Sequence, residues 1–304
     1  MTRVRPYLPT EKISAISGNN GNGSDKIIPQ VAVSSIDRAH EIQLSDIYKE
    51  VFRGHPWHED KVCANILLPP EHPLKCKVQY TLNECHRFDR ERETVVNDCR
   101  AGFTKRLNPG EREGVILLRK GEDLERCIGC GDRLNLIDFY PNFVNHLDLI
   151  DEAISKRTFL GCLAWVEDKP VGFAWGYSVQ TERTSSVNFP TILPLLLNAG
   201  ISPEKTFYGA EVGVLDRFQG KHIGTLLMAY RLDQARQSGY GAYVTRTINP
   251  SVSSIASHIF SEKKGEFLFR DSERGSIWYK WDFADFNQCY VDNLMKGKLK
   301  WQMS

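Results

Sequence analysis

The stretch Gly209-Ala-Glu-Val-Gly-Val-Leu-Asp-Arg-Phe-Gln-Gly-Lys-His-Ile-Gly-Thr-Leu-Leu227 decides how the rest of the chain is interpreted. An apolar strand runs into a glycine-rich turn, and the turn opens directly into a helix. Such a turn directs several backbone N–H groups at one point, with the positive end of the helix dipole behind them. This arrangement is suited to binding a pyrophosphate, and Lys221 adds a cation beside it.

Two common phosphate-binding motifs are excluded by the residues of this turn. A Walker loop requires Gly-x4-Gly-Lys-Ser/Thr, but Leu215 stands at the first glycine position and His222 follows Lys221. A dinucleotide fingerprint requires G-x-G-x-x-G, which the segment from Gly220 to Gly224 does not supply. A glycine-rich turn that binds no ligand is the alternative interpretation.

Strands and helices alternate on both sides of this stretch. Apolar runs bounded by turn residues predict strands near residues 28–33, 160–166, 171–179, 207–215, 242–248, 266–269 and 276–283. Apolar residues at intervals of three and four predict helices over residues 44–52, 144–150, 190–197, 223–239 and 250–262. Asp168-Lys-Pro170 is expected to form the turn between two antiparallel strands. The fold class is therefore α/β around one mixed sheet, with an inserted module over residues 60–137.

The turn resembles the acyl-CoA pyrophosphate loop of the GNAT N-acetyltransferase superfamily. The family motif is Gln/Arg-x-x-Gly-x-Gly/Ala, which Gln219 and Gly224 match, while His222 replaces the middle glycine. The segments around Glu211 and after Ile223 are also similar to the family. The resemblance covers the element order from about residue 30 to residue 283 and implies a mixed, mostly antiparallel sheet flanked by helices. It also implies that acetyl-CoA is bound by Val212, Gly213, Val214, Gln219, Gly220, Lys221, His222, Ile223, Gly224 and Thr225.

The same resemblance implies roles in acetyl transfer to an amine. Glu211 is the expected general base, because a free alkylamine has a pKa of about 10.4 and must lose a proton. Backbone N–H groups around Gly213 and Val214 are expected to bind the thioester carbonyl and then the oxyanion, as a bulge there does in relatives. The predicted helix over residues 250–262 lacks the tyrosine that many relatives use as the acid, so His258 is the candidate donor. The alternatives are a carboxylate paired with an arginine for Glu211, and a solvated surface histidine for His258.

The loop after the first predicted helix is a candidate acceptor site. Trp57 and Glu59, in His55-Pro-Trp-His-Glu59, suit a cationic or amphipathic amine. We expect a small-molecule amine rather than a protein as acceptor. A loop anchored by a buried tryptophan is the alternative.

Six of the eight cysteines lie between residues 63 and 130. Cys127-Ile-Gly-Cys130 is a zinc-knuckle sequence, in which a two-residue gap lets both sulfurs face one ion. A tetrahedral structural zinc would explain how a charge-rich segment with weak periodicity folds, and Cys63 and Cys76 are the expected further ligands. Cys85, His86 and Cys99 remain candidates, whereas Cys162 and Cys289 are interpreted as ordinary thiols. A redox pair and unliganded thiols are the alternatives.

The composition of the chain argues against several classes of protein. The 304 residues carry 39 Lys+Arg and 38 Asp+Glu, a formal net charge of +1. This balance argues against a general nucleic-acid binder, which would be clearly basic. No run of 18 apolar residues predicts a transmembrane helix, and the N-terminus lacks the apolar core of a signal peptide. We expect a soluble, cytoplasmic protein.

Three parts are expected along the chain. Residues 1–28 form a flexible N-terminal segment rich in Gly, Asn and Ser. Residues 29–283 form the acetyltransferase domain, interrupted by the cysteine-rich insertion, and residues 284–304 form a C-terminal tail. The oligomeric state is left open, and a homo-oligomer is compatible with the sequence.

Two other functions are compatible with the sequence. A non-catalytic GNAT-fold protein would use the zinc module and the acyl-CoA pocket for binding or regulation, and His222 and the missing tyrosine favour it. A nucleic-acid-binding zinc protein would be retained on DNA or RNA with a steep salt dependence.

Overall fold

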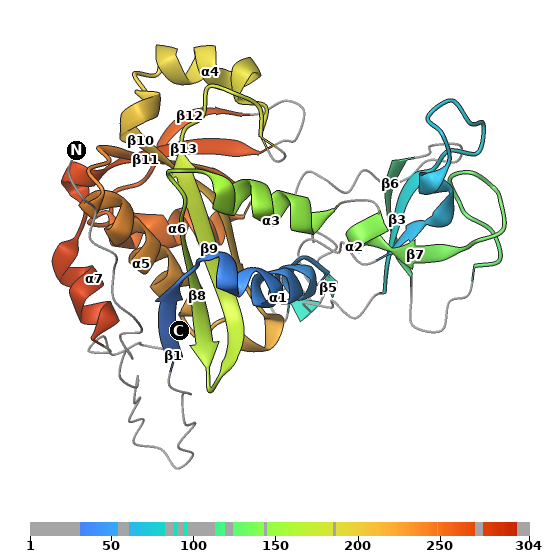
Figure 1. Cartoon of the computed structure of the whole chain (residues 1–304), viewed down its shortest axis with the longest axis horizontal. Helices are drawn as coiled ribbons and strands as arrows, with labels where there is room; N and C mark the ends of the chain where they lie inside the picture. Colours follow the sequence, from blue (N-terminus) through green and yellow to red (C-terminus); the bar gives the residue numbers. More distant parts are fainter. Residues whose placement is uncertain are drawn as a thin grey trace.

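A seven-stranded sheet lies at the centre of the computed structural model (Figure 1). Its strands, in spatial order, are β1 (Val31–Ser35), β8 (Leu160–Val166), β9 (Lys169–Ser178), β10 (Thr206–Val214), β11 (Ala242–Thr247), β13 (Ile277–Asp282) and β12 (Glu266–Arg270). Only β10 and β11 pair in parallel, and every other neighbouring pair is antiparallel. The predicted mixed, mostly antiparallel sheet is confirmed.

The structure describes residues 31–53, 61–82, 88–89, 94–95, 113–118, 124–142, 145–184, 187–247, 249–270 and 276–296. The predicted flexible segment 1–28 lies outside these residues. Within the described part of the chain, no helix has the length and apolar character needed to cross a membrane.

Helices cover both faces of the sheet. On one face, α1 (Glu41–Arg53) and α3 (His146–Ser155) pack beside each other, and Tyr48 of α1 stacks on Trp175 of β9. On the other face, α5 (Ile223–Gln237) lies over β8, β9 and β10 and is flanked by α6 (Pro250–Ile259) and α7 (Gln288–Met295). The remaining helices are α2 (Phe139–Asn142) and α4 (Phe189–Asn198), with short 3-10 turns at η1 (Arg38–His40), η2 (Ala64–Leu67), η3 (Pro203–Lys205), η4 (Asp216–Phe218) and η5 (Phe283–Asp285).

The local signals in the sequence explain most helix boundaries. In α1 the residues at intervals of three and four are buried, as an amphipathic helix requires: Leu44, Ile47, Tyr48, Val51 and Phe52. Asn249 caps α6 by accepting a hydrogen bond from the Ser251 N–H, with Pro250 in the first turn. Gly239 follows α5 with φ +87°, a conformation that glycine adopts without steric cost.

The turn between β8 and β9 lies earlier than predicted. Lys169 pairs with Val166, so Glu167 and Asp168 form a two-residue turn in which Glu167 has φ +48°. Pro170 is already within β9, opposite Trp165, at a point where the register shifts. A proline is tolerated there because the irregularity removes the need for its missing N–H.

The inserted segment forms a separate four-stranded sheet, drawn at the right of Figure 1. Its order is β6 (Glu113–Leu118), β3 (Lys77–Leu82), β2 (Lys61–Cys63) and β7 (Leu136–Asp138), and β4 (Phe88–Asp89) pairs with β5 (Thr94–Val95). We call residues 61–138 the cysteine module. Lys61 pairs with Asp138, so the described strands that begin and end the module lie side by side.

Residues beyond 283, expected as a tail, contain α7. Val291 and Leu294 of this helix are buried, and α7 packs on α5. The apolar residues of Val291-Asp-Asn-Leu294 are three positions apart, which is the helical spacing that anchors the segment to the domain.

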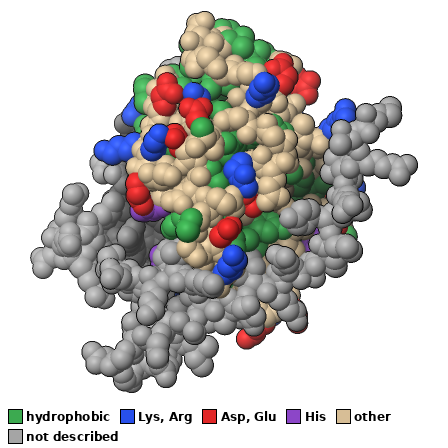
Figure 2. Space-filling model, turned by 90° about the vertical axis from the view of Figure 1, so that its left-hand side faces the viewer, with side chains coloured by type: hydrophobic (Ala, Val, Ile, Leu, Met, Phe, Trp, Pro, Cys, Tyr) green, Lys and Arg blue, Asp and Glu red, His purple; other side chains and the backbone are tan. Residues whose placement is uncertain are grey.

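Charged side chains are interspersed on the face shown in Figure 2. Lys and Arg alternate there with Asp and Glu over the coloured residues. This distribution agrees with the net charge of +1. On the described part of this face, no continuous basic track of the kind that follows a phosphate backbone is visible.

A buried histidine joins α1 to α3. His146 is 3% exposed, its Nε2 lies 2.8 Å from Ser45 Oγ, and its ring stacks on Tyr48. Burial lowers the pKa of His146, and the charge of Lys49 adds to this effect. Protonation therefore favours the unfolded state, in which the imidazole regains an ordinary pKa near 6.5.

We expect the free energy of unfolding to decrease as the pH falls below about 6.5. Each unit by which the pKa of His146 is lowered corresponds to about 1.4 kcal/mol of stability lost once the pH is below both pKa values. Urea unfolding at pH 7 and pH 5 measures this loss. The loss should be smaller in His146→Gln than in the native protein, whereas His258→Gln at an exposed position serves as the control. An identical pH dependence in His146→Gln would contradict the prediction.

Candidate active site and cysteine cluster

Strands β10 and β11 separate after a short paired segment. Residues 206–209 pair in parallel with residues 242–245, and Gly209 is the last β10 residue in this ladder. From Glu211 to Val214, β10 pairs only with β9. Within the described strands, the part of β10 that contains Val212, Gly213 and Val214 therefore has no partner in β11. This split leaves backbone groups of β10 without a sheet partner on the β11 side.

A bulge at Ala210 determines the direction of Glu211. On β9, Tyr177 pairs with Tyr208 and Trp175 pairs with Glu211, with a register shift between Gly209 and Glu211. Because alternate residues of β9 share a face, Tyr208 and Glu211 also share a face, although they are three residues apart. This is the α1 face, on which Trp175 stacks with Tyr48. The bulge thus turns the predicted base toward the α1 side.

The charges of Glu211 and Arg246 both act on Tyr208, and the sequence indicated neither Tyr208 nor Arg246. The pKa of the buried Tyr208 hydroxyl is raised by burial above all, while the Arg246 charge lowers it and the Glu211 charge raises it. These interactions bring Glu211, Tyr208 of β10 and Arg246 of β11 into one electrostatic neighbourhood. The presence of Arg246 is relevant to the alternative in which Glu211 is a strand carboxylate next to an arginine. Neither residue carries a sequence motif that could have identified it.

The glycine-rich loop is stiffened by its own side chains. Gln219 Nε2 donates to the Val214 carbonyl at 3.1 Å and to Asp216 Oδ1 at 2.9 Å. Lys221 Nζ donates to the Arg217 carbonyl at 3.0 Å. The side chains of Gln219 and Lys221 therefore stabilise the turn by bonding within the loop. Binding of an anion would then depend on the backbone N–H groups.

The backbone of the loop turns with positive φ at two positions. Gly220 has φ +71°, and His222 has φ +60° with ψ +11°, both in the left-handed region. A side chain in this region costs roughly 1–2 kcal/mol, which is the physical reason for a glycine at the family's equivalent of His222. The histidine is half-buried, and burial lowers its pKa. His222 therefore adopts the left-handed conformation in spite of its side chain.

The first N–H groups of α5 point out of the helix end. Leu226 N–H bonds to the His222 carbonyl, so Ile223, Gly224 and Thr225 precede the first intrahelical bond and have no acceptor one turn earlier. A Cβ added at Gly224 would lie 3.8 Å from Val214 Cγ2 and 3.9 Å from Ile255 Cδ1, which is ordinary contact. Packing therefore does not require a glycine at position 224.

Gly213, in contrast, is required by packing. A Cβ there would lie 2.7 Å from both Phe173 Cζ and Val51 Cγ1, so α1 approaches β10 closely at this point. The glycine keeps the predicted donor segment of β10 pressed against α1.

The remaining predicted residues are placed as follows. His258 is exposed on α6, and its Nδ1 lies 2.7 Å from Glu262 Oε1. The predicted acceptor residues Trp57 and Glu59 lie outside the described residues, as do Cys85, His86 and Cys99.

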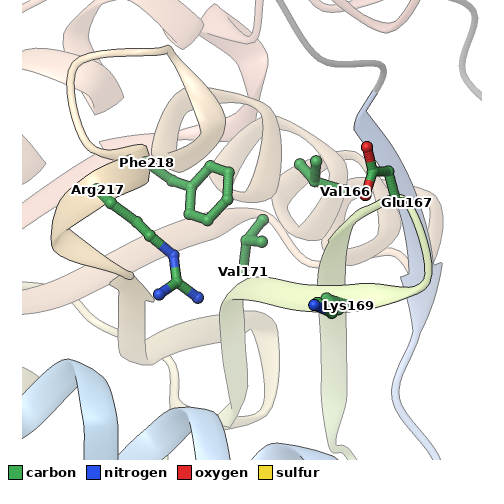
Figure 3. Close-up of a pocket in the computed structure, with 6 residues that line it drawn as sticks. All are labelled: Val166, Glu167, Lys169, Val171, Arg217 and Phe218. Atoms are coloured by element: carbon green, nitrogen blue, oxygen red, sulfur yellow. The ribbon is translucent and has the colours of Figure 1, made fainter.

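A cavity of about 410 Å³ lies beside the loop, on the β9 side of β10 (Figure 3). It is lined by Val166, Glu167, Lys169, Val171, Arg217 and Phe218. These residues come from the β8–β9 hairpin and η4, whereas the strand split opens on the β11 side. The cavity is therefore separate from the split.

Four cysteines of the module converge. The Sγ atoms of Cys63, Cys76, Cys127 and Cys130 all lie within 4.8 Å of one another. Cys63 and Cys130 Sγ are 3.9 Å apart, and Cys76 and Cys127 Sγ are 3.6 Å apart. Four sulfurs arranged tetrahedrally about 2.3 Å from a zinc ion are about 3.8 Å apart. The spacing matches this geometry, and it is far longer than a disulfide bond.

Hydrogen bonds surround these sulfurs. Tyr80 Oη donates to Cys127 Sγ at 3.0 Å, and Asn65 Nδ2 donates to Cys130 Sγ at 3.3 Å. The backbone N–H groups of Asn65 and Val78 bond to Cys63 and Cys76, each two residues earlier in the chain. Hydrogen bonds from Cys63 and Cys76 lower the pKa of the Cys127 thiol. Donors of this kind orient metal ligands and stabilise the thiolate form.

A family model matches the segment that contains the split between β10 and β11 and the glycine-rich loop. The model described as "Acetyltransferase (GNAT) family" matches residues 132–258, from the end of the cysteine module to α6. This segment contains the bulge, the glycine-rich loop and the start of α5, in a sheet of the order given above. The protein has the GNAT fold. The predicted resemblance is thereby supported, and the family match favours acyltransferase activity.

Solved structures with a GNAT fold resemble the chain at low identity. PaiA N-acetyltransferase from Thermoplasma acidophilum, in complex with coenzyme A, is 12% identical over 45% of this chain and 69% of its own, with a TM-score of 0.29. The GNAT domain of S. lividans PAT is 10% identical over 83% of this chain and 90% of its own, with a TM-score of 0.40. No curated protein sequence matches the chain. The GNAT assignment therefore depends on the family match and the strand order.

Proposed function

We propose that the protein is an N-acetyltransferase that moves the acetyl group of acetyl-CoA to a primary amine of a small molecule. The observation that carries this proposal is the split between β10 and β11, which ends at the glycine-rich loop and the N-terminus of α5. A pyrophosphate at the loop would be met by the N–H groups of Ile223, Gly224 and Thr225 and by the helix dipole. The pantetheine arm would then follow β10 along its unpaired side.

The chemistry requires a base, an oxyanion site and an acid. Glu211, on the α1 face, accepts a proton from the amine, whose nitrogen attacks the thioester carbonyl carbon. N–H groups of β10 in the segment from Val212 to Val214 hold the oxyanion. The C–S bond then breaks, and the CoA thiolate takes a proton from His258. The contact between Nδ1 of His258 and Glu262 orients the imidazole ring for this transfer.

The four converging cysteines favour a structural zinc in the module. We propose Cys63, Cys76, Cys127 and Cys130 as its ligands, because their spacing is tetrahedral and outer donors already orient the sulfurs. A closed four-sulfur site has no open position for substrate. The metal would therefore stabilise the module and take no part in acetyl transfer.

Calorimetric titration of acetyl-CoA tests the proposed co-substrate. We expect micromolar binding to the native protein and at least a 100-fold loss in Gly224→Trp, because the indole would cover the N–H groups at the start of α5. The fold tolerates a Cβ at this position, so the loss would report the site. Leu197→Trp, at an exposed position on α4, is the control and should bind normally. Equal binding to Gly224→Trp and the control would contradict the proposal.

A non-catalytic GNAT-fold binding protein is the second candidate. His222 in the loop and the absence of a tyrosine from α6 favour it. Such a protein would bind acetyl-CoA in the titration and would turn over none of a panel of amines. Steady acetylation of any amine by the native protein would exclude it.

A further inference from the structure

A fully buried arginine lies beneath the bulge of β10. Arg231, on α5, is 1% exposed. Its Nη1 donates to the Trp175 carbonyl at 2.7 Å and to the Glu211 carbonyl at 2.8 Å, and its Nη2 donates to Tyr243 Oη at 3.5 Å. Nε is buried and makes no hydrogen bond. Among the described residues, no carboxylate forms an ion pair with this guanidinium.

A buried cation without a carboxylate partner is costly. The desolvation penalty of such a charge amounts to several kcal/mol, on the order of what good hydrogen bonds recover. An apolar side chain at this helix position would avoid the penalty. The two carbonyls that Arg231 binds belong to the register pair Trp175 and Glu211, the first pair after the bulge. The desolvation penalty of Arg231 is therefore incurred at the bulge, where β10 departs from regular sheet geometry.

The geometry around Gly209 makes room for this arginine. A Cβ at Gly209 would lie 2.6 Å from Tyr243 Cε2 and 3.0 Å from Arg231 Nη2. Any other residue at position 209 would displace one of these two side chains. Gly209 is also the last β10 residue that pairs with β11. The end of the parallel ladder, the bulge and the arginine thus form one unit.

The bond to Glu211 fixes the orientation of the following peptide group. A trans peptide directs its C=O and its N–H to opposite sides. Arg231 Nη1 binds the carbonyls of both Glu211 and its β9 partner Trp175, so the Glu211 carbonyl points toward β9. The Val212 N–H therefore points the opposite way, toward the side of β10 that β11 leaves unpaired. A cation at the carbonyl oxygen also polarises the peptide and makes its N–H a stronger donor.

We propose that Arg231 is a positioning residue for acetyl transfer, which holds the β10 bulge so that the Val212 N–H faces the thioester carbonyl. This inference rests on the proposed function. Arg231 itself does not touch the substrate. Its action passes through the Glu211–Val212 peptide, and it stabilises the oxyanion by fixing and polarising one donor.

Steady-state kinetics and hydrogen exchange test the inference with three variants. Arg231→Met removes both carbonyl bonds, and Arg231→Lys keeps the charge while its single nitrogen cannot take the place of the guanidinium fork. Leu232→Ala, at the next and equally buried position of α5, is the control for lost packing. In Arg231→Met we expect kcat to fall by about 100-fold with KM for acetyl-CoA changed less than threefold, as for loss of an oxyanion donor. The control should keep its kcat below its melting temperature.

Hydrogen exchange on the ligand-free protein provides a readout that does not depend on turnover. The amides of residues 209–214 should exchange at least tenfold faster in Arg231→Met than in Leu232→Ala, beyond what any difference in global stability produces. Wild-type kcat or wild-type exchange in this segment would overturn the inference. Should Arg231→Met fail to fold, Arg231→Lys decides by the same two measurements, with about a tenfold loss of kcat expected. If the native protein binds no acetyl-CoA, the proposed function fails, and the exchange result still shows whether Arg231 holds the bulge.

Discussion

Removal of the proposed zinc should unfold the cysteine module while the seven-stranded sheet stays folded. Within the described residues, the buried cluster around the sulfurs consists of Cys63, Cys76, Val78, Tyr80 and Cys127, three of which are proposed ligands. Val78 and Tyr80 contribute apolar burial on the order of 2–3 kcal/mol each, and Leu124, Leu134 and Leu136 pack partly buried against them. A structural zinc contributes about 10–16 kcal/mol in small zinc-binding peptides. The proposed zinc would therefore be the largest single contribution to the stability of the module, and we expect the module to unfold when the ion is removed.

Metal analysis and limited proteolysis check this expectation. The purified protein should contain one zinc per chain, and a chelator should make residues 61–138 susceptible to protease. Cys130→Ser should lose the metal and show the same susceptibility, because it removes one ligand of four. Cys289→Ser, at an exposed cysteine outside the module, is the matched control. A metal-free protein whose module resists protease would show that the four thiols pack without an ion, and iron in place of zinc would change the assignment of the site.

Replacement of Glu211 by glutamine should lower the rate of amine acetylation by 10²- to 10⁴-fold, the range for loss of a general base. The substitution preserves the size of the side chain and removes its ability to accept a proton. Affinity for acetyl-CoA should remain unchanged, because the glycine-rich loop and the start of α5 are the proposed site of that binding. Glu204→Gln, at an exposed carboxylate just before β10, is the control and should retain the native rate.

The pH dependence distinguishes a base from a structural carboxylate. An alkylamine becomes neutral only near its pKa of about 10.4, so the rate of Glu211→Gln should rise about tenfold per pH unit as the amine loses its proton unaided. The native enzyme should show a much weaker rise. A variant whose rate is reduced by the same factor at every pH would instead indicate that Glu211 only supports the strand.

Much of the fold followed from periodicity and turn residues. The apolar stripe of α1 and the Asn249 cap of α6 are local signals, and local signals are sufficient to place such elements. The turn between β8 and β9 was predicted at residues 168–170, whereas it lies at residues 167–168. The difference arises because Pro170 is typical of a turn, while its place in β9 depends on pairing with Trp165. Pairing is a non-local property that residue type does not encode.

The candidate site was only partly predictable. The four converging cysteines could be selected because ligand chemistry restricts the choice to a few residue types. Arg231 could not, since an arginine in a helix is usually solvated, and α5 is covered by β8, β9, β10 and α7 on several sides. The family resemblance implied a bulge around Gly213 and Val214, whereas the register shift lies between Gly209 and Glu211, a position that no residue type marks. Both depend on how the strands and α5 meet, which is a tertiary property.

The adjacent ends of the cysteine module have a consequence for how this chain could have arisen. Because β2 and β7 pair at Lys61 and Asp138, the described start and end of the module lie side by side. A segment anchored in this way can be gained or lost in a single genetic event without rethreading the seven-stranded sheet. Relatives that differ by this one cassette would share the catalytic framework and diverge in what surrounds it.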